Sequence, residues 1–260
     1  MRAHLVQFDI AWEQPAENLA TVRGMLDGAR PSPGDLVVLP EMFSTGFSFN
    51  LARTADTDSG TLRAIAGLAR QARVTVHGSR AVLGPDGKGR NLATIAGPEG
   101  SILAEYAKVH PFSFGKETDH FAGGETVVCY PWRGPGETTT VCAAICYDLR
   151  FPELFRLGLL SGAEVLALGA NWPAPRAAHW RALLIARAIE NQAFALGVNR
   201  CGSDPHLAYA GGSIAVGPRG EVLGELGAGP GVLSVELDFA ALRSWRAVFP
   251  AWRDARLIGR

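Results

Sequence analysis

The chain has 260 residues, of which 47% are hydrophobic and 19% are charged, which is enough for a globular protein with a sizeable core. Lysine plus arginine and aspartate plus glutamate both number 25, so the formal net charge is zero. This balance argues against nucleic acid, a membrane surface or a polyanion as the partner.

The apolar runs and the cysteines indicate a cellular compartment. The first apolar run, residues 3–8, is too short for a secretory signal, and no run approaches the length of a bilayer span. The cysteines form neither a C-x-x-C pair nor a zinc-ligand array, so we expect thiols and no metal site. These features predict a cytoplasmic protein.

The first half of the chain is predicted to open as a β-α-β unit. Residues 3–8 alternate as a strand, residues 16–29 carry apolar side chains at helical spacing, and residues 35–40 form a short apolar strand. Asp58 or Ser59 is placed to cap a second helix. Three further strands are predicted at residues 74–83, 91–96 and 101–106, separated by Gly-Pro turns.

The second half repeats this order. Strands are predicted at residues 141–145, 165–168 and 194–198, with helices at 152–160 and from about 177 to 192. The turn GPEGSILAE at residues 97–105 returns as GPRGEVLGE at residues 217–225. Either two hairpins converged on the same turn chemistry or the fold has two related halves.

Alternating helices and apolar strands predict the α/β class. Hairpins at residues 74–106 and 213–236 do not suit an all-parallel sheet, so we expect two mixed sheets packed face to face with helices outside. No flexible linker interrupts the chain, which favours a single domain over residues 1–260.

Three ionisable residues stand where predicted strands end: Glu41, Lys108 and Cys146. Strand ends in α/β proteins are frequent sites of chemistry, and one sheet edge could bring the three together. A thiol at a strand-to-helix elbow lies near a helix N-terminus, which favours the reactive thiolate. The alternative is that Cys146 is a small buried hydrophobe and that Glu41 and Lys108 are solvated.

The three groups would support acyl transfer. A thiolate attacks an acyl carbon, a carboxylate accepts the thiol proton and later activates water, and an ammonium stabilises the oxyanion. The histidines show no regular sequence relation to Cys146, although a papain-like Cys-His pair remains open.

Glu41 in LPEMFSTGF, Lys108 in EYAKVHPF and Cys146 in AICYDLRFPELFR resemble the Glu-Lys-Cys triad of the nitrilase superfamily of carbon-nitrogen hydrolases. The resemblance runs over nearly the whole chain. It implies a four-layer α-β-β-α sandwich, a homodimer and no metal or organic cofactor. It also implies a nucleophile at Cys146, a general base at Glu41 and an oxyanion donor at Lys108. The backbone N–H of Tyr147 would be a second oxyanion donor, and Glu117 would position the lysine.

Residues close to the Cys146 elbow, and the other cysteines, are expected to have structural roles. Asp148 and Arg150 are expected to hold it as an ion pair. Cys129, Cys142 and Cys201 are expected to be structural.

Residues 169–204 are similar to the ω-amidase branch of the superfamily. That branch implies a small-molecule substrate, 2-oxoglutaramate or 2-oxosuccinamate, cleaved through a thioester to ammonia and the 2-oxo acid. Asn171 and Trp172 follow a predicted strand and should border the pocket. Arg176, His179 or Arg181 could bind the far carboxylate, and an arginine fork suits a carboxylate best.

Other functions remain open at this stage. One is another carbon-nitrogen hydrolase: an aliphatic amidase, an N-carbamoyl hydrolase or a nitrilase. A non-catalytic dimeric scaffold is a different class, although all three triad positions are filled. A metal-dependent amidohydrolase is a third, which chelators would reveal.

Overall fold

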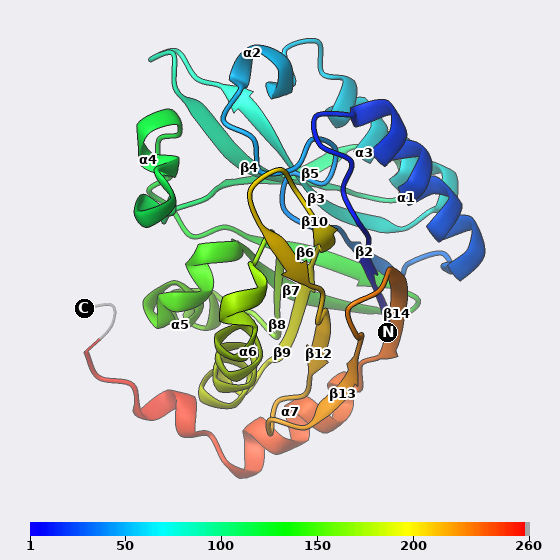
Figure 1. Ribbon diagram of the computed structural model, residues 1–260. Coiled ribbons are helices and arrows are strands. Elements are labelled where there is room, and N and C mark those ends of the chain that lie inside the picture. The colour runs from blue at the N-terminus through cyan, green and yellow to red at the C-terminus, as the bar shows by residue number, and fades with distance from the viewer. Residues whose placement is uncertain (258–260) are drawn as a thin grey trace.

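The computed structural model describes residues 1–257, in which two six-stranded sheets pack face to face (Figure 1). The first sheet has the order β14 (Gly231–Glu236), β1 (Arg2–Gln7), β2 (Leu36–Val38), β3 (Thr75–Leu83), β4 (Gly89–Ala96) and β5 (Ile102–Ala107). The second has the order β13 (Val222–Glu225), β12 (Ile214–Val216), β9 (Phe194–Asn199), β8 (Val165–Ala170), β7 (Glu137–Ile145) and β6 (Cys129–Gly134).

Helices cover the outer faces of both sheets. The α-helices are α1 (Pro15–Ala29), α2 (Leu51–Thr54), α3 (Gly60–Ala72), α4 (Glu117–His120), α5 (Pro152–Leu160), α6 (Ala177–Asn191) and α7 (Phe239–Val248). Helices α1 and α3 pack on the first sheet, and α5 and α6 lie beside the second (Figure 1). A small hairpin of β10 (Cys201–Ser203) and β11 (Ala208–Ala210) stands apart from both sheets. The predicted α/β class and four-layer α-β-β-α sandwich are confirmed.

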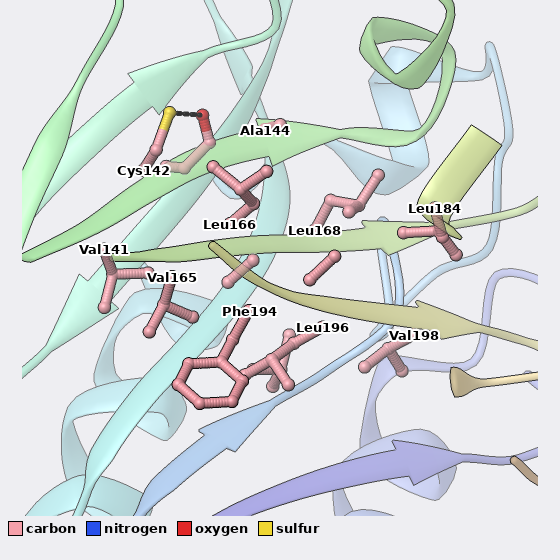
Figure 2. Packing of buried hydrophobic residues seen from close by; sticks show 14 of the residues in the cluster. Val141, Cys142, Ala144, Val165, Leu166, Leu168, Leu184, Phe194, Leu196 and Val198 are labelled. Carbon is pink, nitrogen blue, oxygen red and sulfur yellow. Dashed lines mark hydrogen bonds between the residues drawn. The ribbon is translucent and has the colours of Figure 1, made fainter. Parts of the chain in front are cut away.

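The main core lies between the sheets and beneath α5 and α6. Every residue of β8 and β9 is buried, as expected for parallel strands covered on both faces. Figure 2 shows Leu166 and Leu168 of β8 near Leu196 of β9, with Leu184 of α6 nearby. Burying one such side chain stabilises the fold by about 1.5–3 kcal/mol, so this layer is a rigid support for its strand ends.

Residues 213–236, in which hairpin structure is predicted, are divided between the two sheets. Strands β12 and β13 pair in the second sheet, whereas β14 pairs antiparallel with β1 in the first. Gln7 of β1 holds the connection between β13 and β14, because its Nε2 donates to the carbonyl oxygens of Gly227 (2.7 Å) and Gly229 (2.6 Å). The predicted hairpin is thus present as β12 and β13, and the strand that follows it, β14, belongs to the first sheet.

Helix α3 is capped mainly from outside the predicted pair. Ser59 has a left-handed φ of 59° and makes no side-chain cap, while Asp58 accepts only from Gly60 N (3.0 Å). Asp56 accepts from Thr61 N (2.8 Å) and Leu62 N (3.0 Å). A carboxylate at this end is also favoured by the helix dipole.

Candidate active site

Cys146 stands at a sharp corner between β7 and the 3-10 helix η2 (Cys146–Arg150). Its φ of 46° is left-handed, which is uncommon for a residue with a side chain. Asp148 supports the corner by accepting from the N–H of Ile145 at 2.9 Å. Pro152 then opens α5. The backbone is therefore held in a costly conformation that places the cysteine at the wall of a pocket.

Glu41 follows β2 and is fully buried. Its Oε1 accepts from Lys108 Nζ (2.9 Å) and Asn91 Nδ2 (2.8 Å), and its Oε2 accepts from the N–H of Asn171 (3.0 Å). The next residue, Met42, has a left-handed φ of 44°. Two strained corners, one from each sheet, thus carry the carboxylate and the thiol.

The two sheets come into backbone contact beside this carboxylate. Gly169 of β8 lies so close to the segment after β2 that a Cβ atom there would stand 2.8 Å from Glu41 N and 2.7 Å from Pro40 C. Asn171, two residues later, donates from Nδ2 to the backbone oxygen of Glu41 at 2.6 Å. The glycine is needed for this close approach, which joins Glu41 to the second sheet.

Lys108 follows β5 and is buried between two carboxylates. Its Nζ lies 2.9 Å from Glu41 Oε1 and 2.8 Å from Glu117 Oε2. Burial alone would lower the pKa of Lys108, but Glu117 and Glu41 raise it above its ordinary value. Burial raises the pKa of Glu117, and Lys108 opposes that shift. The lysine is therefore a fixed cation.

The thiol of Cys146 is protonated in the resting site. Burial raises its pKa well above the ordinary value, and the nearby Glu41 raises it further, with Lys108 opposing. Burial and Glu41 therefore outweigh the preference for the thiolate that a helix N-terminus provides. Attack by this sulfur requires a base at the moment of reaction, and Glu41 stands beside it.

A pocket of about 430 Å³, including its open mouth, brings the site residues together. Glu41, Lys108 and Cys146 line it with Tyr147, Asn171, Trp172 and Arg176. Phe47, Phe112, Arg150, Pro173, Leu207 and Tyr209 complete the walls. The pocket therefore combines a carboxylate, an ammonium and a thiol with an aromatic and cationic lining.

Two guanidinium groups reach this pocket. Arg150 lies over the Trp172 ring at 4.9 Å, and Arg176 lies over the Phe112 ring at 5.4 Å. Neither forms an ion pair with a carboxylate in residues 1–257. The expected Asp148–Arg150 ion pair is thus absent from the described part of the chain, because Asp148 is buried and occupied elsewhere.

Asp148 instead links the elbow to the segment that carries the lysine. Its Oδ2 accepts from Tyr106 Oη (2.7 Å), and its Oδ1 accepts from His110 N (3.0 Å) and lies 2.8 Å from His110 Nδ1. Tyr106 and His110 flank Lys108. Sequence reasoning missed these residues because hydrogen bonds between distant strand ends have no fixed spacing in the chain.

Two residues considered for the far carboxylate lie outside the pocket lining. His179 is exposed on α6, with Nδ1 3.2 Å from a guanidinium nitrogen of Arg150. Arg181 pairs with Glu225 at 3.0 Å on the surface. Of the candidates on this stretch, only Arg176 reaches the lining.

The sequence of the chain matches a known protein family over nearly its whole length. A family model described as carbon-nitrogen hydrolase matches residues 2–247. The chain belongs to the carbon-nitrogen hydrolase family. The predicted resemblance to the nitrilase superfamily is thereby confirmed, as is the prediction of an amide-hydrolysing enzyme.

Relatives in this family match over nearly their full length. The omega-amidase YafV of Escherichia coli K12 is 36% identical, with 98% of this chain and 96% of that protein covered. The 2-oxoglutaramate amidase of Bacillus subtilis 168 is 34% identical, with 96% of each covered. The crystal structure of XC1258 from Xanthomonas campestris, described as a CN-hydrolase superfamily protein with an arsenic adduct in the active site, is 34% identical. Its TM-score is 0.91, with 100% of this chain and 98% of that chain covered.

Residues 1–257 contain neither a cluster of potential metal ligands nor a membrane-spanning helix. No group of three or more His, Cys, Asp or Glu side chains there is arranged to hold a metal ion. Over the same residues, every helix is too short or too polar to cross a bilayer.

Proposed function

We propose that this carbon-nitrogen hydrolase is a Cys-dependent ω-amidase that cleaves the terminal amide of a small dicarboxylate, 2-oxoglutaramate or 2-oxosuccinamate. One observation carries the proposal: a single pocket combines Cys146, Glu41 and Lys108 with guanidinium groups that have no carboxylate partner in the described structure. The names of the omega-amidase and 2-oxoglutaramate amidase relatives support the same substrate class.

In the acylation step, Cys146 Sγ attacks the amide carbon while Glu41 accepts the thiol proton. The carbonyl oxygen gains negative charge, which Lys108 Nζ and the backbone N–H of Tyr147 stabilise. The C–N bond then breaks, Glu41 returns the proton to the leaving nitrogen, and ammonia departs. The product on the enzyme is a thioester at Cys146. Glu117 keeps the lysine in place through its 2.8 Å contact.

Deacylation reuses the same groups. Glu41 accepts a proton from water as the water oxygen attacks the thioester carbon, and Lys108 again stabilises the oxyanion. The C–S bond breaks, the sulfur recovers its proton, and the 2-oxo dicarboxylic acid is released. No further reactant is needed.

The far carboxylate of the substrate is assigned to the cationic wall of the pocket, which Arg150 and Arg176 form. Arg176 is the residue on this wall that the sequence indicated, and Arg150 joins it here. A guanidinium binds a carboxylate through two parallel hydrogen bonds, and seating on aromatic rings fixes its plane. Trp172 provides such a seat for Arg150. Asn171 and Trp172 thus contribute to the pocket mainly by fixing Glu41 and Arg150.

The test is ammonia release from 2-oxoglutaramate, 2-oxosuccinamate, butanamide and an N-carbamoyl amino acid. Wild type should prefer a 2-oxo ω-amide, and Cys146→Ala should release none. Arg176→Gln should raise KM for the anionic substrate about tenfold while leaving butanamide unchanged. The surface variant Arg181→Gln is the matched control and should behave as wild type.

Preference for butanamide or the carbamoyl substrate would discard the ω-amidase assignment and keep the triad. Equal effects of Arg176→Gln on charged and neutral amides would remove the carboxylate role of this arginine.

We also propose a cytoplasmic homodimer. Exposed apolar side chains on the helical layer of the second sheet, Leu157, Leu160 and Ile189, support self-association there. Sedimentation velocity should give the mass of two chains, and a single-chain mass at micromolar concentration would contradict the dimer.

A further inference from the structure

Asn91 is a buried amide at the centre of the charged cluster that sequence reasoning did not identify. It lies on β4 and is 2% exposed. Its Nδ2 donates to Glu41 Oε1 at 2.8 Å and to Glu117 Oε1 at 3.4 Å. Its backbone oxygen accepts from Lys108 N at 2.9 Å. Asn91 therefore contacts both carboxylates through its side chain and the backbone of Lys108 through its own backbone.

The orientation of this amide follows from chemistry. Two carboxylates face the Nδ2 end, and only the NH₂ group can donate to both. Within residues 1–257, the opposite atom, Oδ1, has no hydrogen-bond partner. Within the described chain the side chain therefore acts only as a donor, and it donates to the two carboxylates of the cluster.

The charge balance of the cluster explains why a donor is needed. Two buried carboxylates share one ammonium, so the cluster would carry a net negative charge when both are ionised. Like charges in a buried site favour protonation of one carboxylate, and a protonated Glu41 could not accept the thiol proton. Hydrogen bonds to the ionised carboxylate oppose that protonation.

We propose that Asn91 is a positioning residue that keeps Glu41 ionised and oriented as the proton acceptor for Cys146. The proposal rests on the proposed function, because it assigns Asn91 a part in the step that activates the thiol. Asn91 does not line the pocket, so it is assigned to Glu41 and not to the substrate.

The experiment measures how the alkylation rate of Cys146 by iodoacetamide depends on pH, with peptide mass spectrometry separating Cys146 from the other cysteines. Wild type is compared with Asn91→Leu, which fills a similar volume without a donor, and with Glu41→Gln. The control is Asn191→Leu, because Asn191 is an equally buried asparagine in α6 whose Oδ1 also has no partner in the described chain. Thermal unfolding of each variant is followed in parallel.

In Asn91→Leu, the midpoint of the acidic limb should move to higher pH by about one unit, because an ionised carboxylate has lost a donor. The kcat for 2-oxoglutaramate should fall about tenfold to a hundredfold. Asn191→Leu should keep the wild-type midpoint even if it lowers Tm.

An unchanged midpoint in Asn91→Leu, with only a lower Tm, would overturn the positioning role. A profile in Glu41→Gln identical to wild type would overturn the base assignment and this proposal together. If the midpoint moves as expected but no amide is hydrolysed, the role of Asn91 stands and the proposed substrate fails.

Discussion

The two sheets share one plan but differ in the residues at their strand ends. Read from β14 to β5 and from β6 to β13, both sheets have antiparallel, parallel, parallel, antiparallel and antiparallel neighbours in that order. The repeated turn motif joins β4 to β5 in the first sheet and β12 to β13 in the second. The structure therefore favours two related halves over converged hairpins.

Matching positions in the two halves carry different chemistry. Three residues after the motif's final glutamate the first half has Lys108, whereas the second half has Ala228. The proposed nucleophile shows the reverse, because Cys146 follows β7 while the buried Phe8 follows the corresponding strand β1. The candidate site is thus assembled from both halves. Ala228 and Phe8 show that the sheet arrangement shared by the halves needs no polar residue at the positions of Lys108 and Cys146.

The largest effect is expected at the nucleophile, the one reacting group supplied by the second half. Cys146→Ala should lower turnover by more than about 10⁴-fold, because the thioester can no longer form. The variant should keep its Tm, since a single sulfur is removed. Ammonia release and thermal unfolding check this, and substantial remaining activity would refute the assignment.

The final glutamates of the two turn motifs, Glu105 and Glu225, pair with arginines that differ in burial, so removing these arginines should cost different amounts of stability. Glu105 pairs at 2.6 Å with Arg80, whose side chain is 8% exposed and also pairs with Asp56. Glu225 pairs with Arg181, whose side chain is 50% exposed. Arg80→Ala should cost about 3–5 kcal/mol by leaving Asp56 buried without its cation, whereas Arg181→Ala should change stability by less than about 1 kcal/mol. Urea unfolding measures both, and equal losses would contradict this difference.

A buried histidine bridges the two sheets and should make stability depend on pH. His77 of β3 lies 3.0 Å from Tyr130 Oη of β6, and burial lowers its pKa to about 4. The neutral form of His77 is favoured in the folded state. The stability that comes from burying neutral His77 is therefore present above pH 6.5 and is lost as pH falls toward 4. The loss should be about 3 kcal/mol.

Urea unfolding of wild type and His77→Gln between pH 7 and 4 isolates this contribution. The difference between the two proteins should shrink as pH falls. A difference that is constant with pH would show that His77 does not titrate with folding.

Lys108→Ala should reduce activity less than Cys146→Ala does. Loss of the oxyanion donor should lower kcat by about a hundredfold. Steady-state kinetics with 2-oxoglutaramate checks it, and a change confined to KM would assign Lys108 to substrate binding instead.

Sequence patterns could predict most of the fold, because the spacing of apolar side chains along a segment determines whether it forms a buried strand or a helix. The apolar runs that became β8 and β9 and the helix beginning at Pro152 follow period and composition alone. The division of residues 213–236 between the sheets could not be predicted, since β14 pairs with β1, more than 200 residues away in the chain. Pairing between edge strands has no signal within either strand.

The candidate site likewise contains residues that the sequence indicates and residues that only folding brings together. Glu41, Lys108 and Cys146 could be found because each ends a strand within a dense motif. Asn91 and Asp148 could not, because their roles depend on partners brought together by folding. Arg150 was misread for that reason: proximity in sequence suggested Asp148 as its partner, but the structure seats it on Trp172.

The most direct test of the account is rapid acid quenching of the wild-type reaction with 2-oxoglutaramate, followed by mass spectrometry of the Cys146 peptide. The account predicts a 2-oxoglutaryl thioester on Cys146 that rises as ammonia is released and decays as the 2-oxo acid forms. Product formation with no adduct at any time, or an adduct on Cys129 instead, would contradict it.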